Sequence, residues 1–171
     1  MTPDAAVVVA LGANLRGEYA SLEALLEAAL EHFPTEGLRI VARSSWWRSA
    51  AWPDPAGPEY RNGVALVETV LAPLETLVAL RRIEQAFGRD RSERNASRTL
   101  DLDLIAHGGA ILDAPELTLP HPRAHDRLFV MGPLAEIAPE WLHPVSHESA
   151  ATLAKSASVG RDAAPAALHN W

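Results

Sequence analysis

The chain has 171 residues, of which 48% are hydrophobic, and its 22 acidic and 15 basic residues give a net charge of −7. This length supports one domain with a core, and the hydrophobic content excludes a disordered chain. The acidic balance argues against a general binder of nucleic acid or anionic membranes, and the lack of cysteine excludes disulfides and thiolate metal sites. We find no signal pattern and no apolar run as long as a membrane span, so we expect a cytoplasmic protein.

The first elements in chain order are a strand, a helix and a second strand. A continuous apolar run over residues 5–11 predicts a buried central strand. Residues 12–17 follow as a turn, which either is purely structural or cradles a phosphate, although it lacks the known glycine-rich phosphate-loop patterns. Leucines at helical spacing predict a helix over 22–30, and residues 38–47 are interpreted as the second strand.

A proline-rich loop separates the second strand from the third. Residues 49–59 hold three prolines, which exclude a helix or a central strand. Trp52 is the only large apolar side chain of this loop, and it either closes over a ligand or clamps the loop onto the body of the protein. Residues 60–69 predict the third strand, where Asn62 either caps a turn or reads a heterocycle with its amide.

A second helix is predicted from Pro73 to Gly88, because proline favours the first helical position and glycine ends helices. Glu84 lies near the C-terminal end of this helix, where the helix dipole disfavours a carboxylate. Arg81 and Arg82 lie beside it in the sequence. We therefore interpret Glu84 as a solvated carboxylate whose charge is offset by these two arginines in a surface ion pair.

The most informative stretch of the chain is residues 94–105. Its leucines alternate with Asp101 and Asp103, which predicts a strand that presents both carboxylates on one face, roughly 6.5 Å apart. The simple interpretation is that both acids are solvated. However, two neighbouring acids repel one another unless a cation lies beside them, and Mg²⁺ prefers such ligands. Guanidinium groups that suit a metal-bound polyphosphate are nearby, on Arg89, Arg91, Arg94 and Arg98.

The last third of the chain carries fewer signals. His121 lies between two prolines and either donates to a phosphate oxygen or simply packs. Residues 128–138 show helical spacing, and 141–145 are expected to close the core. The remainder is rich in alanine and serine with little periodicity. We therefore expect a domain over residues 1–145 and a partly ordered C-terminal tail over 146–171.

Five blocks of the sequence together resemble the 6-hydroxymethyl-7,8-dihydropterin pyrophosphokinases of folate biosynthesis, and they lie at residues 11–15, 60–69, 82–91, 94–105 and 119–130. The resemblance implies a single-domain α+β fold of the ferredoxin-like kind, in which helices pack on the faces of an antiparallel sheet. It also implies transfer of the β,γ-pyrophosphoryl group of ATP to the hydroxymethyl oxygen of the pterin, with release of AMP. ATP and the pterin are the expected partners of what we expect to be a monomer.

The same resemblance assigns roles to single residues. Asp101 and Asp103 match the pair that holds two Mg²⁺ ions. Contacts to the triphosphate, or stabilisation of its charge, are implied for Arg89, Arg98, His121 and Arg127. Leu104 and Thr118 align, more weakly, with residues whose main chain contacts adenine. On the pterin side, Asn62 matches the amide that reads the ring, and Tyr60 and Phe129 match the rings that sandwich it. Ser49 and Trp52 fall on the loop near the pterin.

The sequence also departs from the family pattern, and other classes of protein remain to be excluded. Ala13 replaces a usual serine, and Asn95 replaces a tryptophan that packs a catalytic loop in many members. No residue stands out as a general base, so metal coordination of the attacking oxygen is expected to do most of that work. The acidic net charge and the lack of an aromatic ribonucleoprotein motif argue against an RNA-binding module. A metal-dependent phosphodiesterase would also use paired acids, but it would hydrolyse ATP without pterin.

Overall fold

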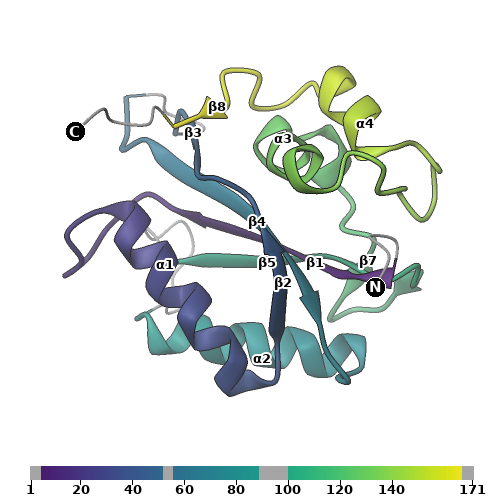
Figure 1. Ribbon diagram of the computed structural model, residues 1–171, viewed down its shortest axis with the longest axis horizontal. Coiled ribbons are helices and arrows are strands. Elements are labelled where there is room, and N and C mark those ends of the chain that lie inside the picture. Colours follow the sequence, from purple (N-terminus) through teal and green to yellow (C-terminus); the bar gives the residue numbers. More distant parts are fainter. Residues whose placement is uncertain (1–4, 52–55, 89–99, 167–171) are drawn as a thin grey trace.

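The computed structural model describes residues 5–51, 56–88 and 100–166 and shows a sheet with helices on both faces (Figure 1). The strands are β1 (Val7–Ala13), β2 (Arg39–Arg43), β3 (Trp47–Ser49), β4 (Tyr60–Glu68), β5 (Asp101–His107), β6 (Leu112–Asp113), β7 (Thr118–Leu119) and β8 (Ala164–Pro165). The helices are α1 (Leu22–His32), α2 (Pro73–Ala86), α3 (Leu128–Ile137) and α4 (Ala150–Ser156), with short 3₁₀ turns η2 (Phe33–Glu36) and η3 (Ala124–Asp126).

The main sheet has the order β5-β1-β4-β3-β8, and β2 also pairs with β4. All of these pairs are antiparallel. The chain path β1-α1-β2-β4-α2-β5 combined with the neighbour order β5-β1-β4-β2 is the ferredoxin-like arrangement. The predicted α+β class, with an antiparallel sheet and helices packed on its faces, is confirmed.

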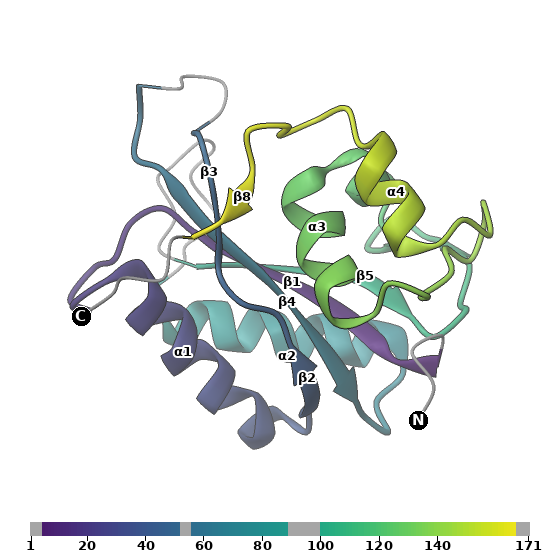
Figure 2. The ribbon, with the colours of Figure 1, turned by 45° about the horizontal axis from the view of Figure 1, so that its top comes forward.

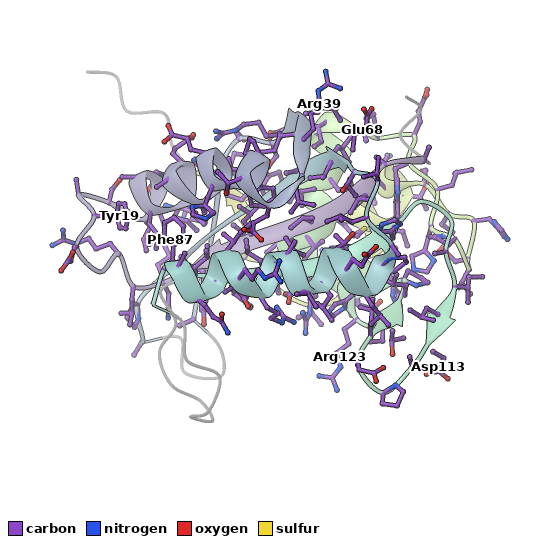
Figure 3. All side chains as sticks on the ribbon, turned by 90° about the horizontal axis from the view of Figure 1, so that it is seen from below. Tyr19, Arg39, Glu68, Phe87, Asp113 and Arg123 are labelled. Atoms are coloured by element: carbon purple, nitrogen blue, oxygen red, sulfur yellow. The ribbon has the colours of Figure 1, made fainter. Side chains whose placement is uncertain are left out.

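The sheet separates two apolar cores, because successive side chains of a strand point to opposite faces. Val7, Val9 and Leu11 of β1 pack toward α1 and α2, whereas Val8 and Ala10 of the same strand pack toward α3 and α4. Figure 3 shows α1 and α2 lying side by side across the first face. The second face is only partly covered by α3, and its open part holds the cavity described below.

The predicted strand over residues 38–47 is broken in the structure into β2 and β3. The reason lies far away in the sequence, on α3. The Glu136 carboxylate accepts hydrogen bonds from the Ser45 main-chain N–H at 2.6 Å, the Ser45 hydroxyl at 2.8 Å and the Trp47 indole N–H at 3.2 Å. These bonds hold the segment between the two strands against α3, and β3 then runs to Ser49.

The C-terminal part of the chain contains two elements that were not predicted. Residues 146–166 belong to the segment expected to form a partly ordered tail, yet they include α4, and β8 pairs with β3. Trp141 is fully buried in the second core as expected, whereas Leu142 and Val145 are exposed and do not close it. No helix in the described part of the chain is long and apolar enough to cross a membrane.

Candidate active site

A cavity of about 260 Å³ opens on the second face of the sheet, next to α3. Most of the described side chains that the sequence assigns to a site meet here. Its walls are formed by Ala10, Leu11, Gly12, Ser49, Ala50, Tyr60, Asn62, Asp101, Asp103, Arg127, Phe129 and Val130. The cavity therefore joins β1, β3, β4 and β5 with the start of α3.

The strand register places the polar groups of the cavity in one row. Gly12 of β1 lies opposite Asn62 of β4 on one side and opposite Asp101 of β5 on the other. Paired residues point to the same face, so Asn62 and Asp101 face one space from strands that are roughly 10 Å apart. Gly12 was expected to begin a turn, but β1 continues to Ala13, and the missing side chain at Gly12 leaves the floor between them open.

Asp101 and Asp103 lie on one face of β5, as the alternation predicts, while Leu102 and Leu104 are buried on the other. Burial, and secondly the negative charge of Asp101, raise the pKa of Asp103 to about 6. The charges of Arg81 and Arg127 act in the opposite direction. A cation beside the pair would relieve both unfavourable effects, so the two carboxylates fit a divalent metal.

The same pair would leave most of the coordination sphere of a metal to other ligands. The described residues contain no group of three or more acidic, histidine or cysteine side chains that could hold a metal. Mg²⁺ is commonly bound in this way, by one or two carboxylates together with water and substrate phosphates. The acidic pair thus suits a metal that arrives with a phosphate-bearing substrate.

Glu84 of α2 supports the strand that carries these acids, and the interpretation of it as a solvated group is wrong. Its carboxylate is buried, accepts the main-chain N–H of Leu102 at 2.8 Å and pairs with Arg81 at 2.9 Å. Arg81 in turn donates to the Leu102 carbonyl at 3.1 Å. Leu102 lies between Asp101 and Asp103 on the outermost strand of the sheet, so α2 replaces the missing neighbour strand at this point.

The other end of the cavity suits a flat heterocycle. The buried Asn62 amide donates to the Ser49 hydroxyl at 2.8 Å, which fixes its orientation. Tyr60 lies opposite Ser49 in the β3–β4 pairing, and Phe129 faces the same cavity from α3. Two aromatic rings beside a held amide provide apolar faces together with a hydrogen-bonding edge.

Arg127 and His121 add positive charge and a donor near the acids. The Arg127 guanidinium carbon lies 5.7 Å from the centre of the Phe129 ring and belongs to the cavity wall. Burial, and secondly the charge of Arg127, lower the pKa of His121 to about 4, so its ring is neutral at pH 7. Its Nδ1 accepts the Arg123 N–H at 3.1 Å, which leaves the proton on Nε2 as a donor.

The remaining predicted site residues are less directly placed. Leu104 is buried in the first core, so only its main chain is available to a ligand, and Thr118 is exposed on β7. Neither belongs to the cavity wall. Trp52, Arg89 and Arg98 lie outside the described residues, as does Asn95.

A second, larger cavity of about 700 Å³ adjoins the first and was not foreseen. The two share Ser49, Ala50, Arg127 and Phe129. Its outer wall comes from the C-terminal segment, through Val159, Gly160 and Asp162. The sequence offered no signal for this wall because residues 157–163 have no regular periodicity.

Known proteins resemble this chain in sequence over most of its length. The family model for 7,8-dihydro-6-hydroxymethylpterin-pyrophosphokinase matches residues 8–139. A 2-amino-4-hydroxy-6-hydroxymethyldihydropteridine pyrophosphokinase of Synechocystis is 45% identical over 140 residues, which cover 81% of this chain and 69% of that protein. The enzyme of the same name from Haemophilus influenzae is 41% identical over 138 residues, covering 81% and 84%.

Solved structures support the fold. The crystal structure of wild-type Plasmodium falciparum HPPK-DHPS superimposes on 88% of this chain with a TM-score of 0.66 and 14% sequence identity. The present chain spans only 44% of that longer protein, so this likeness concerns the fold alone. The family model and the two relatives identify the family of this chain, and the solved structure is consistent with its fold. The chain belongs to the 7,8-dihydro-6-hydroxymethylpterin pyrophosphokinase family.

Proposed function

We propose that this protein transfers the β,γ-pyrophosphoryl group of ATP to the hydroxymethyl oxygen of 6-hydroxymethyl-7,8-dihydropterin, an Mg²⁺-dependent step of folate biosynthesis. The hydroxymethyl oxygen attacks the β-phosphorus, the bond from that phosphorus to the oxygen it shares with the α-phosphate breaks, and AMP leaves. The observation that carries this proposal is the single row of Asp101, Gly12 and Asn62 on one open face. It supports a heterocycle at one end and a metal-bound triphosphate at the other.

Asn62, Tyr60 and Phe129 bind the pterin in this proposal, with Ser49 holding the Asn62 amide in place. The hydroxymethyl group then points along the floor at Gly12 toward the acids. A ligand held by its ring in this way places its reacting oxygen without further adjustment, which is how an active site lowers the entropic cost of reaction.

Asp101 and Asp103 would hold two Mg²⁺ ions. Bound Mg²⁺ neutralises charge on the triphosphate and makes the attacking hydroxyl more acidic. Arg127 supplies a positive charge beside the metal site, and the Nε2 proton of His121 is available to a phosphate oxygen. We assign Arg89 and Arg98 to the triphosphate, Trp52 to the pterin loop, and the main chain of Leu104 and Thr118 to adenine, on the family pattern alone.

The direct experiment is an assay by mass spectrometry with purified protein, ATP, Mg²⁺ and 6-hydroxymethyl-7,8-dihydropterin. AMP and pterin pyrophosphate in equal amounts, both absent without Mg²⁺ or without pterin, are the expected result. Formation of ADP or free phosphate instead would indicate a different phosphoryl chemistry. Turnover of ATP in the control without pterin would favour a metal-dependent hydrolase.

A further inference from the structure

Residues 158–166 connect the two walls of the proposed pterin site. At one end, Val159 and Ser158 donate their main-chain N–H groups to the Asp126 carbonyl at 2.8 and 3.1 Å, and Leu128 donates to the Val159 carbonyl at 2.9 Å. These bonds lie directly beside Phe129. The segment, which we call the C-terminal strap, therefore begins against the start of α3.

The other end of the strap is attached to β3 and the residues after it. β8 pairs with β3, and Ala166 donates to the Trp46 carbonyl at 2.9 Å. The Asp162 carboxylate accepts the main-chain N–H of Ala50 at 2.6 Å, next to Ser49. Figure 2 shows the chain leaving α4 and passing beside α3 to reach β3. The strap thus spans from the Phe129 side of the cavity to the Ser49 side.

Gly160 is the point where the strap meets the Phe129 ring. A Cβ atom built at Gly160 would lie 2.5 Å from Cδ1 and 2.9 Å from Cε1 of that ring, closer than real contacts allow. Gly160 also has a φ of +71°, a backbone conformation that other residues adopt with strain. The ring therefore rests against bare backbone, and the surface of the strap determines how far it can retreat from the cavity.

We propose that the C-terminal strap is part of the pterin site and that Gly160 is a positioning residue for the Phe129 ring. The inference rests on the proposed function, because it assigns the Phe129 ring to the pterin. It also extends the site beyond residues 8–139, to which the family model is matched. A side chain at Gly160 would push the ring into the space that the pterin occupies, so pterin binding would weaken while ATP binding would not.

The test is a double-mutant cycle read by direct binding of 6-hydroxymethyl-7,8-dihydropterin and, separately, of ATP with Mg²⁺. Gly160→Ala is expected to weaken pterin binding about tenfold, equal to about 1.4 kcal/mol, with ATP binding within about twofold of wild type. In a Phe129→Ala background the ring is gone, so adding Gly160→Ala should weaken pterin binding no further. The proposal would be overturned if Gly160→Ala bound pterin with wild-type affinity. It would also be overturned if Gly160→Ala lowered the pterin affinity of the Phe129→Ala variant as much as it lowers that of the wild type.

Gly37→Ala is the matched control for backbone strain. Gly37 has a φ of +81°, and a Cβ there meets its nearest neighbour, Leu71 Cδ1, at an ordinary 3.8 Å. It should lower the melting temperature as Gly160→Ala does while leaving pterin binding unchanged; a comparable loss of pterin affinity in this control would count against the proposal. Failure of the wild-type protein to bind pterin would contradict the proposed function itself. The role of the strap is tested by the variants, relative to wild-type binding.

Discussion

The surroundings of Asn62 restrict the ligands that its amide can bind. It is buried, its amide nitrogen is held by Ser49 at 2.8 Å, and Gly12 beside it has no side chain to fill the space. A buried amide held in one orientation discriminates strongly between ligands, because a ligand without the matching groups leaves polar atoms unpaired. In the proposed function Asn62 would therefore select the heterocycle, whereas the acids of β5 would act at the other end of the cavity.

Asn62→Ala should weaken pterin binding by about 2 kcal/mol, roughly thirtyfold, because the ring loses its hydrogen-bonding partner. Binding of ATP with Mg²⁺ should be nearly unchanged. Both are measured by isothermal titration calorimetry. Ser49→Ala, which removes the group that holds the amide but leaves the amide itself, should give a smaller loss. Equal weakening of pterin and ATP by Asn62→Ala would refute the assigned role.

The raised pKa of Asp103 sets the direction in which protein stability and metal affinity should change with pH. Burial and then Asp101 raise this pKa to about 6 in the folded protein, above the value of about 3.9 in an unfolded chain. The folded state therefore holds the proton more tightly, and in this pH window the metal-free protein loses stability as the pH rises. A metal held by Asp103, as proposed, would bind the ionised carboxylate, so its apparent affinity should fall as the pH drops below about 6.

Calorimetric titration with Mg²⁺ and a non-hydrolysable ATP analogue between pH 5 and pH 7.5 checks this expectation. The apparent affinity should be constant near neutral pH and fall by up to about tenfold per unit below pH 6, as one competing proton requires. Asp103→Asn should bind Mg²⁺ weakly, with a flatter pH profile. A wild-type affinity that does not change over the whole range would show that Asp103 is not a ligand.

At the scale of elements, the strand β5 depends on α2 for the hydrogen bonds of its outer edge. Glu84→Ala should lower the free energy of unfolding by about 2–3 kcal/mol, since it removes the acceptor of the buried Leu102 N–H and the carboxylate that pairs with Arg81. Glu84→Gln keeps an acceptor and should lose less. Urea denaturation measures both.

Arg82→Ala is the control on the same helix, because among the described residues Arg82 forms an ion pair with Glu36, and its side chain is 67% exposed. Its cost should stay below about 1 kcal/mol. If Glu84→Ala were no more destabilising than Arg82→Ala, the support of β5 by α2 would be ruled out.

The elements that could be predicted are those whose pattern is local. The alternation of Leu102 and Leu104 with Asp101 and Asp103 predicts both the strand and its acidic face, and the structure confirms it. The break between β2 and β3 could not be predicted, because it is imposed by Glu136 from a helix far along the chain. Likewise, the sequence around Glu84 does not reveal that α2 lies against an open strand edge. α4 and β8 are too short to show a period.

At the scale of the whole molecule, the cavity is possible because α3 covers only part of the sheet (Figure 1). α1 and α2 lie side by side across the opposite face, and the ring of Tyr19 stacks on Phe87 with a centroid distance of 6.0 Å (Figure 3). The face with α3 instead presents Asp101, Gly12 and Asn62 to the open cavity. Both sides of the sheet thus hold a buried apolar core, and the α3 side also leaves room for the candidate site.

In the proposed mechanism, the two acids of β5 hold the metal on which pyrophosphoryl transfer depends. This role is tested by AMP formation by Asp101→Asn and Asp103→Asn at saturating ATP, pterin and Mg²⁺, with Asp113→Asn, at an exposed position of β6, as control. Both site variants should lose at least about 100-fold in rate while melting like folded protein, and the control should keep the wild-type rate. A wild-type rate in either site variant would contradict the account.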